Sequence, residues 1–121
     1  MRKVKVKICG LKRAQDIECV NRLLPDYIGF VFAKTKREVT EQQAVQLKAM
    51  LNPQIKAVGV FVNAEIDKIV RLAKSRTIDI IQLHGDEDAA YCERLRLQTE
   101  LPIIKAVRVK DAGSFENLQA Y

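Results

Sequence analysis

The sequence predicts an α/β protein with a parallel sheet, and three observations support this fold class. Strand-like apolar runs alternate with helical patterns about five times along the chain. Several of these runs are continuously apolar, as in strands that are covered on both faces. No hairpin signal such as Asn-Gly separates them. A doubly wound sheet and a (βα)8 barrel both fit, and in either fold ligands bind at the carboxyl ends of the strands.

Length and composition bound the class of protein. The chain has 121 residues, 48% of them hydrophobic, which predicts a single domain over residues 1–121. We expect a cytoplasmic protein that binds no membrane, because it has neither a long apolar run nor a signal-peptide pattern. Basic and acidic residues interleave and aromatics make up only 6%, so the net charge of +6 favours a solvated surface over nucleic-acid binding. Three widely spaced cysteines predict neither disulfides nor a metal site.

The first strand is expected at residues 3–8, where lysines alternate with β-branched residues. Its apolar face, which we expect to pack on the core, consists of Val4, Val6 and Ile8. Lys5, Lys7 and Cys9 then share the other face. Neighbouring ammonium groups favour the thiolate, the reactive form of a cysteine. Cys9 is therefore a candidate base or nucleophile, with a buried packing residue as the alternative. Gly10 allows a sharp turn after it.

The next elements follow from apolar spacing and from breakers. A helix is predicted over residues 13–24, where apolar residues recur at helical spacing. These residues are Ile17, Val20, Leu23 and Leu24. The apolar run 27–32 predicts a buried strand, and a basic loop over 34–38 follows it. Thr40 and Gln43 then predict a capping box that begins the second helix. The apolar side of that helix is formed by Ala44, Leu47, Met50 and Leu51.

Three further strands are predicted over residues 55–62, 78–83 and 102–109. Asn63 and Asp86 follow the first two of them, and each is a plausible cap for the helix that comes next. The helix after Asp86 is expected to run from residue 87 to about residue 98. Asp111 or Ser114 is expected to open a last helix.

Polar side chains gather where the predicted strands end. The residues concerned are Cys9 with Gly10, Arg37, Gln82, His84 and Arg108. Gln82 and His84 are two residues apart and share one face of their strand. Because carboxyl ends of parallel strands meet at one rim, these groups from several strands form a candidate active site.

These features together resemble the phosphoribosylanthranilate isomerase family of tryptophan biosynthesis. The motifs that carry the resemblance are Lys7-Ile8-Cys9-Gly10, Ile28–Phe32, Arg37, Gly59–Asn63, Gln82–Asp86 and Lys105–Val109. They cover essentially the whole chain and match about the N-terminal three fifths of a family member. The resemblance implies a TIM (βα)8 barrel, of which this chain forms an incomplete part with about five βα units. It also implies an intramolecular isomerase that performs an Amadori rearrangement on a small phosphorylated substrate, without a metal or organic cofactor.

The resemblance implies a role for Cys9 and Arg37. Cys9 would be the general base that removes the C2′ proton of the sugar, with Lys7 and Gly10 in support. Arg37 would meet the anthranilate carboxylate, for which its planar fork is suited. Thr35-Lys36 stands where the family usually has serine-proline, which changes the stiffness of this loop.

Three more residues are expected to bind substrate by the same resemblance. These are His84, Gln82 and Arg108. Each has a structural alternative: a helix cap for His84, a satisfied core amide for Gln82, and an ion pair with a core carboxylate for Arg108.

The family's general acid is an aspartate at the end of the sixth strand, and its phosphate is bound by Gly-rich loops after the seventh and eighth. We therefore expect the 121 residues to be the N-terminal part of the enzyme and to be inactive alone. Asp111 is expected to be a helix cap and not a substitute acid. Apolar side chains such as Phe30 and Val60 would be exposed on the inner face, and the first and fifth strands would offer open edges. We expect the isolated chain either to self-associate through these edges or to pack into a flatter, rearranged sheet.

Two other functions remain open from the sequence. The chain could be a non-catalytic barrel fragment that folds only by association. It could also belong to another phosphate-sugar barrel enzyme, such as an epimerase or indole-glycerol-phosphate synthase. A single histidine and the lack of a matching motif disfavour the second of these.

Overall fold

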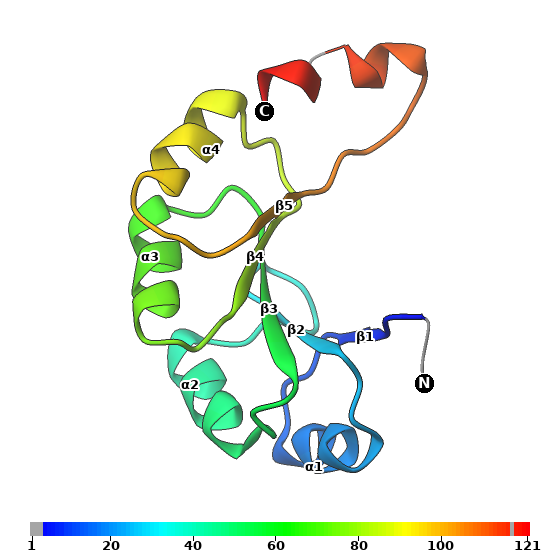
Figure 1. The fold of residues 1–121 in the computed structure, drawn as a ribbon, viewed down its shortest axis with the longest axis vertical. Helices are drawn as coiled ribbons and strands as arrows, with labels where there is room; N and C mark the ends of the chain where they lie inside the picture. Colours follow the sequence, from blue (N-terminus) through cyan, green and yellow to red (C-terminus); the bar gives the residue numbers. More distant parts are fainter. Residues whose placement is uncertain (1–3, 117) are drawn as a thin grey trace.

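The computed structural model describes residues 4–116 and 118–121, in which strands and helices alternate. The elements in chain order are β1 (Lys7–Cys9), α1 (Ala14–Leu23), β2 (Tyr27–Val31), α2 (Glu41–Met50), β3 (Lys56–Phe61), α3 (Ile66–Lys74), β4 (Ile80–Leu83), α4 (Ala89–Arg96), β5 (Ile103–Lys105) and the 3₁₀ helices η1 (Ala112–Phe115) and η2 (Leu118–Ala120). The strands form one parallel sheet in the order β1-β2-β3-β4-β5. The α-helices follow the outer side of this curved sheet, and its concave side faces the other way (Figure 1). The predicted parallel α/β fold is confirmed.

The helix-facing side of the sheet carries the hydrophobic core. The register aligns a set of strand side chains that are fully buried against the helices, namely Ile28, Phe30, Ala57, Phe61, Ile81 and Leu83. From the helices, Ile17, Ala44, Ile69 and Leu95 fill the same core. Burying one such leucine, isoleucine or phenylalanine contributes about 1.5–3 kcal/mol, so this layer is the main source of stability.

The concave side carries the residues of opposite parity. Cys9 pairs with Gly29, and Gly29 with Val58, so that these three lie in one row. Phe30 has the other parity: it faces the helices and is fully buried, and Val60 on the concave side is only 8% exposed. The prediction that Phe30 and Val60 would be exposed is therefore wrong. The burial of Phe30 follows from its parity. Val60 does face the concave side, in a central strand where Val31 and Gln82 are its register partners on either side.

Two predicted N-caps are confirmed, and in both the capping side chain and the N–H that it accepts lie within one turn of the chain. Thr40 caps α2, with its Oγ1 accepting the Gln43 N–H at 3.0 Å and the Gln43 side chain accepting the Thr40 N–H at 2.8 Å. Asp111 caps η1 by accepting the Gly113 N–H at 2.9 Å, although the helix it opens is a short 3₁₀ helix. The apolar residues predicted to face the core from the first two helices are buried, except for Leu23, Leu24 and Met50, which are exposed.

Two predicted caps are wrong. Glu65, and not Asn63, occupies the N-cap position of α3, without a side-chain cap hydrogen bond. The Asn63 side chain instead accepts the Asp86 N–H across the next loop at 2.8 Å. The cap of α4 is Asp88, whose Oδ1 accepts the Tyr91 N–H at 2.8 Å, and not Asp86. Both acidic and amide residues near a helix start fit a cap by sequence, and a tertiary contact decides between them.

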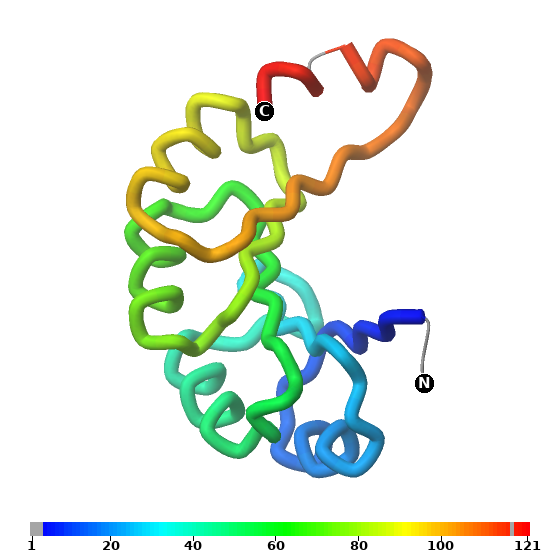
Figure 2. The backbone as a smooth tube through the Cα atoms, viewed as in Figure 1, coloured from blue at the N-terminus to red at the C-terminus, as the bar shows by residue number. Residues whose placement is uncertain are grey.

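The two outer strands are shorter than predicted. β1 covers only residues 7–9, and Val4 and Val6 are exposed, so they do not pack on the core as expected. Residue 3 lies outside the described residues. β5 ends at Lys105, and the chain from residue 106 onward leaves the sheet and arches back toward α4 (Figure 2). An outer strand pairs on one side only, so fewer hydrogen bonds hold its ends.

Candidate active site

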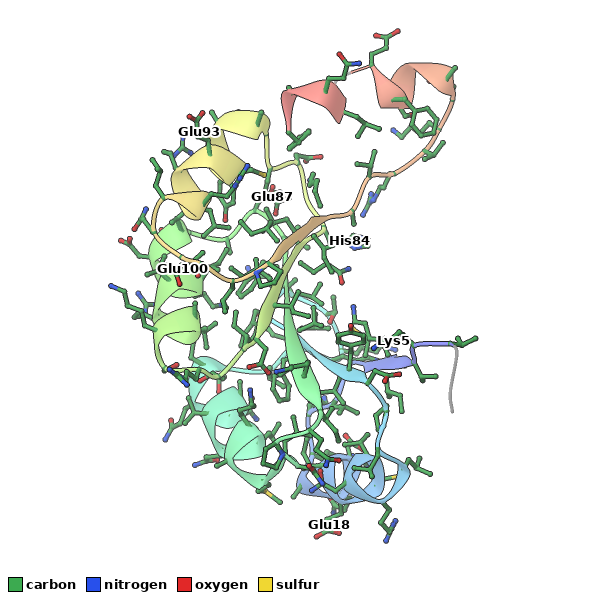
Figure 3. The ribbon with its side chains drawn as sticks, in the orientation of Figure 1. Lys5, Glu18, His84, Glu87, Glu93 and Glu100 are labelled. Carbon is green, nitrogen blue, oxygen red and sulfur yellow. The ribbon has the colours of Figure 1, made fainter. Side chains whose placement is uncertain are left out.

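The predicted site residues lie at the carboxyl ends of the strands. Cys9 ends β1, Arg37 lies in the loop after β2, His84 follows β4 and Arg108 comes after β5. Figure 3 shows His84 and Lys5 toward the concave side, whereas Glu18 and Glu93 are carried by helices on the outer side. The rim of a parallel sheet thus brings together side chains that are far apart in the sequence.

Cys9 presents an exposed thiol on the concave face. Its sulfur lies over Gly29, its register partner in β2. A Cβ added at Gly29 would lie 2.5 Å from Cys9 Sγ, so glycine is required for the thiol to take this position. The exposure excludes the alternative in which Cys9 is a buried packing residue.

Gly10 brings Arg37 against the end of β1. Gly10 has φ of +88°, in the left-handed region, and a Cβ there would collide with the Arg37 side chain. Arg37 Nη1 donates to the Cys9 carbonyl at 3.4 Å, a long hydrogen bond. The guanidinium and the thiol therefore lie at the same strand end, with the guanidinium still largely available to a ligand.

The loop that carries Arg37 is held by polar contacts instead of a proline. Thr35 Oγ1 accepts the Arg37 N–H at 3.1 Å. Lys12 Nζ donates to the Lys36 carbonyl at 2.7 Å and so ties this loop to the one after β1. These bonds supply restraint at the Thr35-Lys36 step, where the sequence predicted a change in stiffness.

Lys7 and Gln82 form a bridge across the concave face. Lys7 Nζ donates to Gln82 Oε1 at 2.6 Å, although β2 and β3 lie between their strands. Only a curved sheet lets a lysine from β1 reach β4, because adjacent strands are about 4.8 Å apart. The bridge uses the amide oxygen of Gln82.

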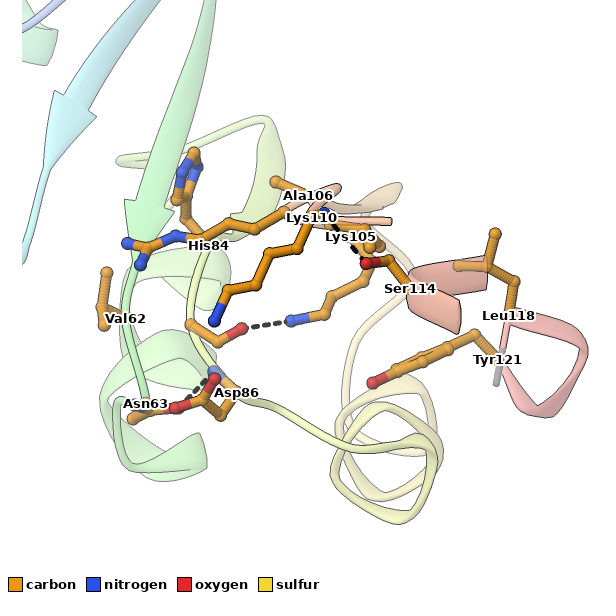
Figure 4. Close-up of a pocket in the computed structure, with 13 residues that line it drawn as sticks. Val62, Asn63, His84, Asp86, Lys105, Ala106, Lys110, Ser114, Leu118 and Tyr121 are labelled. Carbon is orange, nitrogen blue, oxygen red and sulfur yellow. Dashed lines mark hydrogen bonds between the residues drawn. The ribbon is translucent and has the colours of Figure 1, made fainter. Parts of the chain in front are cut away.

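A hollow of about 450 Å³ lies at the ends of β3, β4 and β5 (Figure 4). His84 and Arg108 both line it, together with Asn63, Asp86 and Lys105. Cys9 and Arg37 are not among its lining residues. The structure therefore divides the predicted site residues into a pair at the β1–β2 end and a pair at the β4–β5 end.

A buried ion pair beneath this hollow was missed by the sequence analysis. Glu87 has a fully buried side chain, and its Oε1 lies 2.9 Å from Lys105 Nζ. Its two oxygens also accept the N–H groups of Gly85 at 2.9 Å and Asn63 at 2.8 Å. The sequence contains one signal for this pair, which is a lysine in the otherwise apolar run Ile103–Val107. A lysine buried within such a strand requires a negatively charged partner.

The surroundings of Glu87 keep it ionised. Burial raises the pKa of the Glu87 carboxyl, but the hydrogen bonds from Lys105 and from the Asn63 backbone outweigh burial. Its pKa therefore lies below the ordinary value of 4.5. The carboxylate is thus a fixed negative charge at neutral pH.

The other two cysteines differ from Cys9 in place and surroundings. Cys19 is exposed on the outer helix α1. Cys92 is buried on α4, and burial raises the pKa of its thiol. Both lie in helices, whereas Cys9 lies at the carboxyl end of a strand.

Two further findings concern the described residues only. Within residues 4–116 and 118–121, no group of three or more histidine, cysteine, aspartate or glutamate side chains is arranged to hold a metal ion. In the same part of the chain, no helix has the length and apolar character needed to cross a membrane.

Comparison with known sequences identifies one family. The family model for N-(5′-phosphoribosyl)anthranilate (PRA) isomerase matches residues 6–121. The isomerase of Endomicrobium trichonymphae is 52% identical over 107 residues, which cover 88% of this chain and 54% of that protein. The isomerase of Thermoanaerobacter sp. strain X514 is 44% identical over 118 residues, covering 98% and 57%. The chain thus spans about half the length of the curated relatives it matches.

Solved structures give the same result. The phosphoribosylanthranilate isomerase of Thermotoga maritima superposes with a TM-score of 0.81 at 34% identity, covering 95% of this chain and 56% of that one. Another structure of the enzyme, in complex with reduced 1-(o-carboxyphenylamino)-1-deoxyribulose 5-phosphate, also gives 0.81 at 34% identity, covering 95% and 59%.

The ion pair at Glu87 leads to a prediction about stability. Replacing Glu87 with glutamine should lower the free energy of unfolding at pH 7 by about 3–5 kcal/mol, the usual cost of removing one partner of a buried pair. Because the folded-state pKa of Glu87 lies below 4.5, its stabilisation is fully present above that pH and is lost as the pH falls through the folded value. Urea unfolding of both proteins over a pH series measures the difference.

The matched control is Glu93→Gln, which removes an exposed carboxylate from the neighbouring helix α4. This change should leave the free energy of unfolding nearly unaltered at every pH. The difference in unfolding free energy between the parent and Glu87→Gln should shrink as the pH falls below 4.5. A difference that did not shrink would contradict the assignment of a paired, ionised carboxylate.

Proposed function

Because the chain belongs to the N-(5′-phosphoribosyl)anthranilate isomerase family, we propose that the whole protein converts N-(5-phosphoribosyl)anthranilate into 1-(2-carboxyphenylamino)-1-deoxyribulose 5-phosphate. This is an isomerisation of tryptophan biosynthesis, and we place it in the cytoplasm. The observation that carries the proposal is the meeting of an exposed thiol and a guanidinium at the end of β1, with Gly10 and Gly29 making room for both.

In the proposed reaction Cys9 is the general base. An acid protonates the ring oxygen, the bond from that oxygen to C1′ breaks, and the Cys9 thiolate takes the proton from C2′. Return of a proton to C1′ and loss of the C2′ hydroxyl proton give the 2-keto product, so no atom is gained or lost. The exposure of the thiol on the concave face supports this role, because the base must reach a carbon of the bound sugar.

Arg37 is proposed to bind the anthranilate carboxylate. Its guanidinium lies next to Cys9, and among the described residues it makes one long hydrogen bond, at 3.4 Å, to the Cys9 carbonyl. A planar fork with free donors suits a carboxylate. The related enzyme binds an analogue that carries both a carboxyphenyl group and a phosphate, which supports a ligand of this class.

His84, Arg108 and Gln82 are proposed as further substrate ligands. His84 and Arg108 line the hollow at the ends of β4 and β5, and Gln82 lies on the concave face between that hollow and Cys9. By family likeness the general acid is an aspartate at the end of a sixth strand, and the phosphate is held by Gly-rich loops after the seventh and eighth. Residues 1–121 would then supply the base and the carboxylate ligand.

We further propose that a polypeptide of residues 1–121 self-associates through its sheet edges. β1 and β5 each pair on one side only in the described sheet, and Ile104 of β5 is 46% exposed. Lys5 and Lys7 belong to the β1 end of the sheet, where their charges oppose pairing, so the proposed contact is the β5 edge. The isomerase of Thermotoga maritima is dimeric.

The first prediction tests the base. In the whole protein, Cys9→Ala should lower kcat by at least about a hundredfold, the usual contribution of a positioned base, with little change in KM. Steady-state turnover of phosphoribosylanthranilate measures both constants. Cys19→Ala, which removes an exposed thiol on α1, is the control and should keep the parent kcat. A Cys9→Ala protein with near-parental kcat would remove Cys9 from the mechanism.

The second prediction tests the carboxylate ligand. Arg37→Ala should weaken binding of a reduced product analogue by about 1.5–3 kcal/mol, the range for hydrogen bonds to charged groups. An analogue without the carboxylate should lose far less, which titration calorimetry can compare. Lys36→Ala removes a neighbouring exposed charge and should affect both ligands slightly. Equal losses for both ligands in Arg37→Ala would exclude contact with the carboxylate.

The third prediction tests the edge contact. The apparent mass of a 1–121 polypeptide should rise with concentration in sedimentation experiments, and Ile104→Lys should suppress that rise by placing a charge at the β5 edge. Leu97→Lys is the control, because Leu97 is 82% exposed at the end of α4, away from the edge. A polypeptide that stays monomeric at all concentrations would rule out the association.

A further inference from the structure

The proposed mechanism makes no use of Glu87, the most deeply buried carboxylate described near the site. Its side chain is 0% exposed. It accepts one backbone N–H from the loop after β3, at Asn63, and one from the loop after β4, at Gly85. The Lys105 ammonium on β5 completes the set. One carboxylate therefore fastens the ends of three neighbouring strands.

These bonds fix the main chain on both sides of His84. The His84 N–H donates to the Phe61 carbonyl at 2.8 Å. The next N–H, that of Gly85, donates to Glu87, and the Gly85 carbonyl accepts from Lys105. The Asp86 N–H then donates to Asn63 Oδ1 at 2.8 Å. These bonds hold the backbone from which the imidazole projects, and two of them, at the Gly85 N–H and the Gly85 carbonyl, go to Glu87 and Lys105.

The turn also has little spare room. A Cβ at Gly85 would lie 2.7 Å from Asn63 Oδ1. Asn63 itself has φ of +50°, in the left-handed region that asparagine tolerates better than most residues, and surrounding contacts hold it there. Here the hydrogen bond from its N–H to Glu87 is one of those contacts.

A buried ion pair is a poor means of gaining stability alone, because apolar residues of similar volume often serve as well. This pair lies directly beneath the hollow that His84 and Arg108 line. Its bonds go to backbone groups of the turn that presents His84, and that placement suits a role in orientation.

We infer that Glu87 is a positioning residue, which acts through the Gly85 turn to hold the His84 imidazole toward substrate in the hollow. The expected effect on KM rests on the proposed function. The expected effect on the orientation of His84 concerns this chain alone. Lys105 shares the role by holding the Gly85 carbonyl and by balancing the buried charge.

A double-mutant cycle in the whole protein is the kinetic test. Glu87→Gln should raise KM for phosphoribosylanthranilate on the order of tenfold, as expected for one lost oriented hydrogen bond, with a smaller change in kcat. In a His84→Ala background the same change should raise KM no further, since residues that act through one contact are not additive. A rise of equal size in both backgrounds would overturn the inference.

A spectroscopic test needs no substrate. The His84 ring resonance is assigned by its disappearance in His84→Ala, and it should shift in Glu87→Gln at fixed pH. If the protein turned over no phosphoribosylanthranilate, the proposed function would fail, and this measurement would still decide the positioning role. An unmoved His84 resonance in a folded Glu87→Gln protein would overturn it.

The matched control is Asp79→Asn. Asp79 also accepts a lysine, Lys48 at 2.8 Å, and a backbone N–H, that of Ala57 at 2.8 Å, but at the opposite, amino-terminal ends of β3 and β4. Its loss should lower stability without moving the His84 resonance or KM. If Glu87→Gln does not fold, Glu87→Gln/Lys105→Met replaces it, since that variant leaves no unpaired buried charge and should shift the resonance in the same way.

Discussion

The alternation of side chains across a parallel sheet is the constraint on which the rest of this molecule depends. Residues of one parity face the helices and are almost wholly apolar, whereas residues of the other parity line the concave face. Because strand side chains have a period of two, a slip of one residue in β1 would turn Cys9 toward the helices and Ile8 toward the open face. The apolar layer at Ile28 and Phe30 makes such slips costly. The position of the thiol is therefore a consequence of how the core packs on the other side of the sheet.

The sequence could predict what depends on neighbours along the chain. The alternation of lysine and valine placed Cys9 and Lys7 on one face, and the Thr40–Gln43 pair marked the start of α2. It could not predict what depends on contacts between loops. Asn63 and Asp86 both read as caps, but they bond to each other instead. Glu87 read as the first residue of a helix because nothing nearby in the sequence shows that its partners are Asn63 and Lys105. The extent of β5 likewise depends on pairing that a linear pattern does not encode.

Charge at the rim is organised in two ways. Around Arg37 the cations are exposed and hold the loop by single bonds to backbone atoms, such as that from Lys12 to the Lys36 carbonyl. Around Lys105 the cation is mostly buried and neutralised by a carboxylate. An exposed guanidinium remains free to meet an anion, while a buried pair resists rearrangement. The β1–β2 end thus suits binding of charge, and the β4–β5 end suits fixed geometry.

The bridge between Lys7 and Gln82 also bears on the order in which the chain folds. It joins residues 75 positions apart, whereas each pair of adjacent strands is connected through a single helix. The entropy lost on closing a loop grows with its length, so this contact is favourable only after β2 and β3 have brought the two ends together. The helix-side core forms from local units and can assemble first. The contact between Lys7 and Gln82 on the concave face is therefore expected to form late, after the two strands between them have paired.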